Sequence, residues 1–278
     1  MESSTSNSDA DLAEQVAIVT GGGRGIGRTI ALAIAAAGGK VCIASRSDRQ
    51  LAEVVAEIKA KGGVAIGCVT NVTDWEAVQQ MVETTLKSFG PPTLLVNNAG
   101  SADGLGRIDS VDPLLWWRDV EVSLKGSLLC CRAVVPGMVA RRSGRVINVS
   151  SDVGIGPCPD GSSYACSKAA LLRLTDSLAA ETAGDGVSVF AISPGLVHTA
   201  LTEHVLSTGP GQRWYSRIKS PTWVEPEHAA RLVVLLASGK ADPLSGRYLR
   251  ISDNIEDLVR RAEEIGQKNL YRLSVGRL

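Results

Sequence analysis

The 278-residue sequence has no net charge, no pair of cysteines at CxxC spacing and no apolar run that approaches membrane-spanning length. Its 29 basic residues balance 29 acidic ones, and beyond Arg141, Arg142 and Arg145 there is no basic cluster, which argues against a nucleic-acid partner. The six cysteines lack the spacing of common metal sites, so we expect neither a bound metal nor a disulfide. The lack of a long apolar run predicts no membrane partner and a cytoplasmic location.

The two ends of the chain differ in character from its middle. Residues 1–11 are rich in Ser, Asn and Asp and lack the apolar stretch of a signal peptide, so we expect a disordered tail there. Residues 12–252 alternate strand-like and helix-like patterns, and a chain with 44% hydrophobic residues can bury one large core. We predict a single α/β domain over this range, followed by a helical tail over residues 253–278.

A glycine-rich turn, TGGGRGIG at residues 20–27, joins the first predicted strand to the first predicted helix. The strand, VAIV at residues 16–19, is β-branched and uncharged, which is typical of a strand buried on both faces. Apolar residues then recur at helical spacing from Ile26 to Ala37. Glycines here allow backbone N–H groups at the helix start to approach a pyrophosphate, whereas an ordinary strand–helix turn would bind nothing. The strand–turn–helix context favours dinucleotide binding.

The residue after the second predicted strand is basic. The strand, KVCIAS at residues 40–45, precedes Arg46, about 20 residues beyond the glycine turn, where an acidic residue would bind the ribose 2′-hydroxyl of NAD. A guanidinium group instead suits a phosphate, so we predict that Arg46 and Arg24 bind the 2′-phosphate of NADP(H). The alternative is two solvated arginines. We interpret Asp48 as a helix N-cap and not as the NAD-type acid.

Small polar residues follow several later strands, at the sheet edge where ligands bind in parallel α/β proteins. They are Asn71 after residues 63–69, NNAG at 97–100 after 93–96, Ser150 and Ser151 after 145–149, and Ser193 after 187–192. A helix predicted over residues 163–183 then carries Tyr164 and Lys168 one turn apart, on one face.

One long helix is predicted over residues 113–142, and it carries Ser123 on its middle turns. Its apolar face comprises Trp116, Val120, Leu124, Leu128, Cys131 and Val135. This face exceeds what one sheet needs to cover it, so we expect a homodimer or homotetramer.

The region after the sixth strand is predicted to control access to a substrate. Residues 198–223 are polar, aromatic and irregular, and with the turn before them, about residues 196–223, they are long enough for a mobile lid. A helix follows Pro226, a last strand spans residues 247–251, and residues 254–265 form an amphipathic helix.

Taken in order, these motifs resemble the short-chain dehydrogenase/reductase family over about residues 11–252. The matching pieces are TGGGRGIG at 20–27, NNAG at 97–100, the Ser151 that ends INVSS, YACSK at 164–168 and SPG at 193–195. The resemblance implies a Rossmann-type, doubly wound fold with a seven-stranded parallel sheet of order 3-2-1-4-5-6-7, flanked by helices. It implies that the dinucleotide is lined by Gly21, Gly23, Arg24, Gly25, Ile26, Gly27, Arg46, Asn71, Val72, Asn98, Ala99, Gly100, Tyr164, Lys168, Val197 and Thr199.

The same resemblance implies a catalytic set of Ser151, Tyr164 and Lys168, with Ser123 as a fourth member. Two positions depart from the family pattern: Asn71 stands where Asp is usual, and Ser123 stands where relatives carry Asn. The Asn71 side chain could still accept a bond from the adenine amino group. Ser123 could hold a water beside Lys168, or its hydroxyl could bond back to its own helical turn.

These features predict an NADPH-dependent oxidoreductase that interconverts a small ketone or aldehyde and an alcohol. Tyr164 would act as the acid/base group, Lys168 would stabilise its phenolate, and the Ser151 hydroxyl would bind the reacting oxygen. Two alternatives remain open: an NAD-dependent alcohol dehydrogenase working in the oxidative direction, and a cofactor-binding scaffold with little turnover. Residues 152–162 and 198–223 are expected to determine the substrate.

Overall fold

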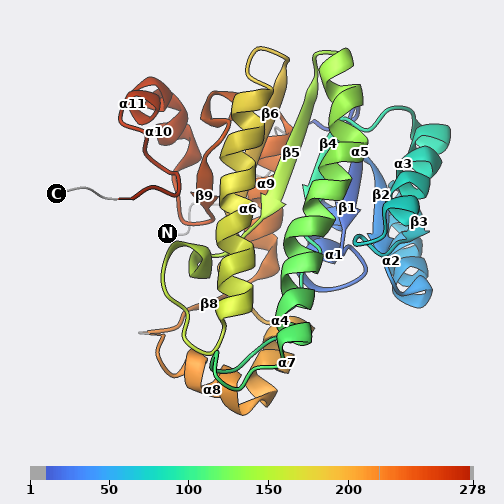
Figure 1. Cartoon of the computed structure of the whole chain (residues 1–278). Coiled ribbons are helices and arrows are strands. Elements are labelled where there is room, and N and C mark those ends of the chain that lie inside the picture. Colours follow the sequence, from blue (N-terminus) through green and yellow to red (C-terminus); the bar gives the residue numbers. More distant parts are fainter. Residues whose placement is uncertain (1–10, 219, 276–278) are drawn as a thin grey trace, which may run out of the picture.

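The computed structural model describes residues 11–218 and 220–275 (Figure 1). The predicted disordered tail therefore lies, apart from Asp11, outside the described residues, as do the last three residues of the predicted helical tail.

A seven-stranded parallel sheet forms the centre of the molecule. The strands are β1 (Val16–Thr20), β2 (Lys40–Ser45), β3 (Val64–Val69), β4 (Leu94–Asn97), β5 (Gly144–Val149), β6 (Val187–Ser193) and β9 (Tyr248–Arg250). Their order is β3-β2-β1-β4-β5-β6-β9, with every pair parallel. The predicted order is confirmed, with β9 as the seventh strand. The order reverses between β1 and β4, which is where such sheets leave a crevice for a ligand.

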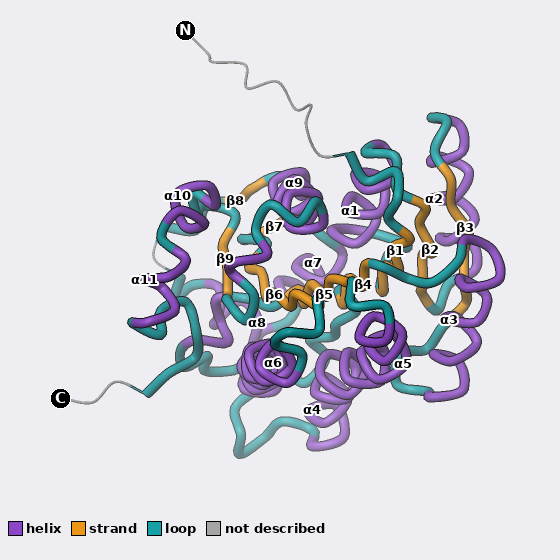
Figure 2. The backbone as a smooth tube through the Cα atoms, turned by 90° about the horizontal axis from the view of Figure 1, so that it is seen from above, coloured by secondary structure: helices purple, strands orange, loops and turns teal. Residues whose placement is uncertain are grey.

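Helices cover both faces of the sheet, as the view from above shows (Figure 2). One layer contains α1 (Gly25–Ala36), α2 (Asp48–Ala60) and α9 (Pro226–Ala237), and the other contains α3 (Trp75–Phe89), α4 (Pro113–Val120), α5 (Gly126–Ala140) and α6 (Ser162–Glu181). Two clusters of buried apolar side chains, one on each side of the sheet, hold these layers in place. The central strands β1 and β4 are uncharged and fully buried because both of their faces lie inside the protein.

The start of α2 differs from the sequence interpretation by one residue. Ser47 caps α2 by accepting a hydrogen bond from the Gln50 N–H, so Asp48 is the first helical residue and not the cap. Asp74 caps α3 by accepting from the N–H groups of Glu76 and Ala77. In both cases a short polar side chain accepts hydrogen bonds from free N–H groups of the first turn.

The long predicted helix contains a π-helical turn, Glu121–Lys125, between α4 and α5. Asp119, Ser123 and Ser127 are buried at four-residue spacing, while Leu128, on the predicted apolar face, is 49% exposed. In a regular α-helix, residues four positions apart are rotated by about 40° relative to each other about the helix axis. The wider π turn compensates for this rotation and keeps the three side chains on one face. The predicted apolar face therefore divides into buried and exposed residues in this half of the helix, because the π turn departs from a regular α-helical period.

The helical stretch Pro113–Ala140 is long and apolar enough to cross a membrane by length and composition alone, although 44% of its most apolar 18-residue window is buried inside the protein. The expectation that no segment approaches that length was too strong. The stretch packs against α3, α6 and the sheet, as a core helix does.

The predicted irregular lid is largely helical. It contains α7 (Ala200–Ser207) and α8 (Gly209–Tyr215), flanked by a small parallel sheet of β7 (Leu196–Val197) and β8 (Trp223–Val224). Short helices of this kind escape detection because their side chains are mixed in polarity, whereas their caps, Thr199 and Thr208, define them locally. Beyond β9, the amphipathic segment forms α10 (Ile255–Arg260) and α11 (Ala262–Gln267).

Candidate active site

A cavity of about 450 Å³ lies at the carboxyl ends of the central strands. All but one of the predicted cofactor residues line it: Gly21, Gly23, Arg24, Gly25, Ile26, Gly27, Arg46, Asn71, Val72, Asn98, Ala99, Gly100, Tyr164, Lys168 and Thr199. Val197 lies outside this lining, buried in β7, where it pairs with Val224. The cavity thus brings these residues together from six separate segments of the sequence.

Glycine is required at the cavity floor because backbone and side-chain atoms crowd it. A Cβ on Gly27 would lie 2.4 Å from both the Asn98 Nδ2 and the Gly21 carbonyl oxygen. Gly21 adopts a φ of +64°, a conformation that other residues rarely take. The Asn98 amide donates hydrogen bonds to the carbonyls of Thr20 (2.9 Å) and Gly21 (3.2 Å). Asn98 therefore fixes the glycine turn as well as lining the cavity.

The start of α1 offers unpaired N–H groups to the cavity. Its first turn contains no acidic residue, and its N-cap, Arg24, makes no side-chain capping bond. A helix start with free N–H groups and no competing carboxylate favours an anion. Together with the close approach allowed by the glycines, this donor set fits the pyrophosphate of a dinucleotide.

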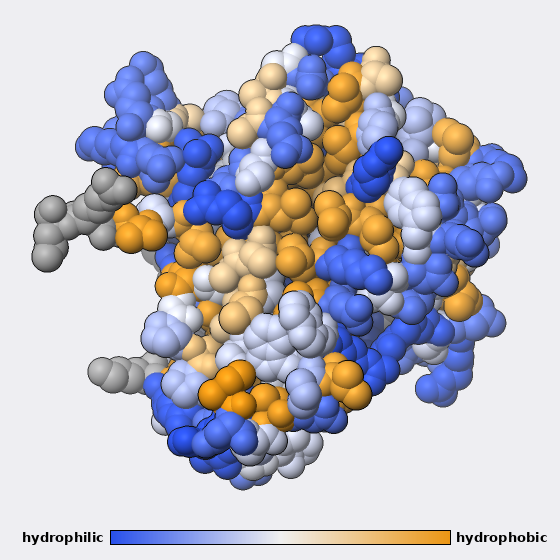
Figure 3. All heavy atoms as spheres, in the orientation of Figure 1, coloured by the Kyte–Doolittle hydropathy of each residue, from blue (hydrophilic) through white to orange (hydrophobic). Residues whose placement is uncertain are grey.

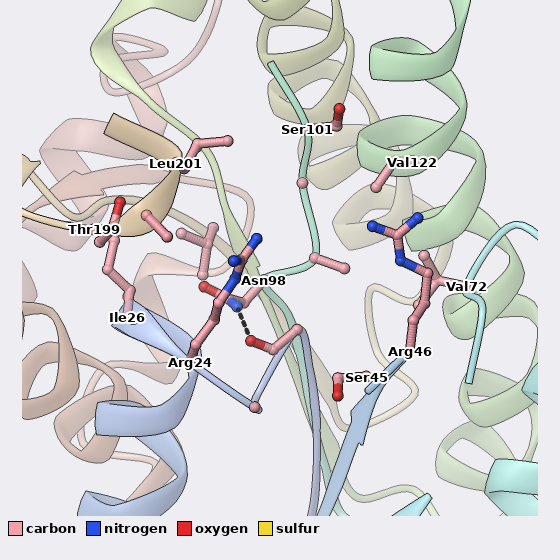
Figure 4. A pocket seen from close by; sticks show the side chains of 18 of the residues that line it. Arg24, Ile26, Ser45, Arg46, Val72, Asn98, Ser101, Val122, Thr199 and Leu201 are labelled. Atoms are coloured by element: carbon pink, nitrogen blue, oxygen red, sulfur yellow. Dashed lines mark hydrogen bonds between the residues drawn. The ribbon is translucent and has the colours of Figure 1, made fainter. Parts of the chain in front are cut away.

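Two arginines reach the same hollow from different elements. Arg24 extends from the start of α1 and Arg46 from the end of β2, and both guanidinium groups point toward the space between them (Figure 4). Both side chains are exposed, so they keep their hydration and remain able to bind a phosphate.

Asn71 is engaged within its own turn. Its side-chain oxygen accepts hydrogen bonds from the Thr73 N–H (3.2 Å) and the Thr73 hydroxyl (3.0 Å). The expected role of this oxygen as an acceptor for the adenine amino group would therefore require the turn to rearrange. Val72, buried beside it, offers an apolar wall.

Tyr164, Ser151 and Lys168 meet beside the cavity. Tyr164 and Lys168 both lie on α6, with the Lys168 Nζ 5.4 Å from the Tyr164 ring centroid. The Nζ donates to the Val149 carbonyl at 2.9 Å. Ser151 hydrogen-bonds with Tyr164, whereas the hydroxyl of Ser150 donates to the Lys168 carbonyl at 3.1 Å. The geometry thus gives the two adjacent serines different roles.

Burial dominates the ionisation of the tyrosine and the lysine. It raises the pKa of Tyr164 to about 12; the charge of Asp119 adds to the rise, and the bond with Ser151 opposes it. Burial also lowers the pKa of Lys168 to about 8. Burial therefore favours the neutral form of both groups.

Ser123 lies in the π-helical turn with no accessible surface, and its hydroxyl has no hydrogen-bond partner among the described residues. The alternative in which this hydroxyl bonds back to its own turn is therefore wrong. A Cβ added to Gly100 would lie 3.6 Å from both the Ser123 hydroxyl and the Lys168 Nζ, so these two groups border the same small space. A buried polar atom without a partner is the usual setting for an ordered water.

Sequence reasoning missed Asp119, a fully buried carboxylate on α4. It also missed Ser101, Asp103 and Arg118, which line the cavity. An aspartate that replaces an apolar residue on the buried side of a helix is a detectable signal, but finding it requires the π turn to be known. Across residues 11–218 and 220–275, no group of three or more His, Cys, Asp or Glu side chains could hold a metal ion.

Comparison with known proteins identifies the family. The model of the family described as short chain dehydrogenase matches residues 15–209. A short chain dehydrogenase of Pseudocercospora fijiensis is 35% identical over 279 residues, covering 94% of this chain and 89% of that protein. A 3-oxoacyl-[acyl-carrier-protein] reductase of Synechocystis is 38% identical over 233 residues, covering 83% and 92%. The chain belongs to the short-chain dehydrogenase/reductase family and is an oxidoreductase by family.

Solved structures agree with this assignment. A crystal structure from Beutenbergia cavernae, described there as an NAD(P)-dependent gluconate 5-dehydrogenase with NADP bound at low occupancy, has a TM-score of 0.79 and 33% identity over 88% of this chain and 97% of that one. A structure described as a short-chain alcohol dehydrogenase from Sinorhizobium meliloti has a TM-score of 0.79 and 32% identity, covering 87% and 96%.

Proposed function

We propose that the chain is an NADPH-dependent carbonyl reductase that converts a small ketone or aldehyde to an alcohol, with residues 12–252 as its catalytic domain. The observation that carries this proposal is that a phenol kept protonated by burial, Tyr164, lines the same cavity as Arg24 and Arg46. Names of relatives offer two substrate classes, a 3-oxoacyl thioester and a sugar acid. Residues 152–162 and the lid, 196–223, are the segments that would distinguish them.

In the proposed reaction the cofactor, when bound, supplies the hydride. The Ser151 hydroxyl binds the carbonyl oxygen and Tyr164 donates its proton to that oxygen as negative charge develops there. The O–H bond of the phenol breaks as the O–H bond of the alcohol forms. Lys168, held by the Val149 carbonyl, is placed to return a proton to Tyr164 through a water beside Ser123.

A panel of ketones and aldehydes assayed with NADPH and with NADH tests this function. Consumption of NADPH that depends on a carbonyl compound, with weaker use of NADH, is the expected result. If the enzyme instead oxidises alcohols with NAD and binds NADH more tightly than NADPH, the oxidative dehydrogenase is the better description. The similarity to the structure described as a short-chain alcohol dehydrogenase supports this alternative. Cofactor binding without turnover on the whole panel would favour a scaffold.

A cytoplasmic location is part of the proposal. Of the six cysteines, all free, Cys42, Cys68, Cys130 and Cys131 are buried. Cys42 and Cys68 lie with their sulfur atoms 3.5 Å apart as thiols, an arrangement suited to a reducing compartment.

We propose that Ser123 helps to hold the proton-relay water. Ser123→Ala should lower kcat several-fold with little change in NADPH affinity, because it removes one of the groups around that water. Ser123→Asn should keep or raise activity. Ser123→Ala should not lower the melting temperature, since the wild-type hydroxyl has no hydrogen-bond partner among the described residues.

Ser127→Ala serves as the matched control for Ser123→Ala. Ser127 lies one turn further along, and its hydroxyl donates to the Ser123 carbonyl at 2.7 Å without lining the cavity. We expect this variant to lose stability more than activity. Unaltered kcat in Ser123→Ala between about pH 6 and 9 would contradict the relay.

We propose that the chain assembles as a homodimer or homotetramer through the face of α4 and α5. Leu114 is 78% exposed, Trp117 59% and Leu128 49%, and apolar side chains gather over α5 and α6 (Figure 3). Exposed apolar surface of this kind marks an interface. Sedimentation at micromolar concentration should show an oligomer that Trp117→Glu with Leu128→Glu dissociates; a wild-type monomer would refute the proposal.

A further inference from the structure

Asp119 accepts four hydrogen bonds in the protein interior. Its Oδ1 accepts from the Ser101 hydroxyl (2.7 Å) and the Asp103 N–H (2.8 Å). Its Oδ2 accepts from the Gly104 N–H (2.9 Å) and the Ser163 hydroxyl (2.6 Å). Such short hydroxyl contacts are typical of an ionised carboxylate, and all four donors are neutral.

The four donors come from the two segments that flank the reacting groups. Ser101, Asp103 and Gly104 belong to the loop that leaves β4, and Ser101 and Asp103 line the cavity. Ser163 lies in the first turn of α6, next to Tyr164. The loop also packs tightly on α4, since a Cβ on Gly104 would lie 2.6 Å from the Trp116 Cα. Asp119 therefore joins the cavity wall to the helix that carries the proton donor.

We infer that Asp119 is a positioning residue for this reaction: its carboxylate ties the loop after β4 to the first turn of α6 and so fixes Tyr164 against the cavity wall, with its negative charge acting on the phenol. This inference rests on the proposed role of Tyr164. The groups that face Tyr164 are Lys168 on α6, Ser151 and Cys158 after β5, and Asp119 on α4. A carboxylate close to a phenol opposes its ionisation, so Asp119 raises the pKa of Tyr164 beyond the larger effect of burial.

Titration of the tyrosinate absorbance tests the charge directly and requires no turnover. The chain contains four tyrosines, so the signal of Tyr164 is the difference between each protein and its Tyr164→Phe counterpart. In Asp119→Asn the Tyr164 transition should move to lower pH by about one unit, the smaller end of the effect of a nearby charge. The alkaline limb of kcat/KM for carbonyl reduction should move in the same direction. An unmoved Tyr164 transition in Asp119→Asn overturns the inference.

Ser163→Ala provides a second variant, which keeps the charge and remains informative if Asp119→Asn fails to fold. Because the carboxylate then has one donor fewer, the Tyr164 transition should move to higher pH, opposite to Asp119→Asn. A shift to lower pH would overturn the inference. Activity that survives Tyr164→Phe would instead refute the proposed function, and the titration would still report on Asp119.

Discussion

Tyr164→Phe should abolish carbonyl reduction while leaving NADPH binding intact. The substitution removes the phenolic hydroxyl, which is the proton donor, and keeps the ring that lines the cavity. General acid catalysis typically contributes ~10²–10⁴-fold, so kcat should fall by about that factor. Steady-state kinetics with NADPH and an active ketone measure kcat, and quenching of protein fluorescence measures the dissociation constant of NADPH.

The control for Tyr164→Phe is Tyr271→Phe, which makes the same change in a residue that does not line the cavity. It should behave as the wild type. Lys168→Ala should also lose activity, because it removes the ammonium group that lies 5.4 Å from the Tyr164 ring centroid. Near wild-type kcat in Tyr164→Phe would show that another group donates the proton.

Arg46→Asp should reverse the choice of cofactor. In the wild type, a charge-assisted bond from Arg46 to the 2′-phosphate should be worth about 1.5–3 kcal/mol, so NADPH should bind roughly tenfold or more tightly than NADH. An aspartate would repel the phosphate and accept a bond from the free 2′-hydroxyl of NADH. The two dissociation constants, measured for each protein at one salt concentration, give the ratio directly.

Arg49→Asp separates a local contact from a general effect of charge. Arg49 lies three residues further along, is exposed, and forms an ion pair with Glu53 at 3.9 Å without lining the cavity. Arg49→Asp should leave the ratio of the two dissociation constants within about twofold of the wild-type ratio, because solvent and salt screen an exposed charge outside the cavity. Equal wild-type affinities for NADH and NADPH would refute the assignment of Arg46.

The sheet and its order could be predicted because their signals are local. Uncharged β-branched runs alternate with helical patterns, and parallel strands joined by helices have few possible arrangements. The two short lid helices and the π turn could not be predicted in this way. Besides its local cap, α8 is tied to the loop before α6 by Arg213 and by Arg217 just beyond the helix, and both arginines bind Asp160.

The candidate site could be predicted as a set of residues but not as a set of ionisation states. Spacing and motif place Tyr164 and Lys168 on one helical face, and the structure has them there. The degree of burial around them decides their pKa values, and burial depends on how loops from three strands close over the site. Asp119 was missed for the same reason, since its four donors come from segments more than a dozen residues away in the sequence.

The π turn at Glu121–Lys125 acts as a one-residue insertion in an otherwise α-helical segment. The extra residue changes the angular offset about the helix axis between the residues before the turn and those after it. One residue corresponds to about 100° in a regular helix. Deleting any one residue of this turn would restore a regular α-helix. It would also turn α4 away from α5, so that either Asp119 or the buried face of α5 would have to leave the interior. Homologous chains that align without gaps across residues 113–140 should therefore share this irregular turn, whatever residue they carry at position 123.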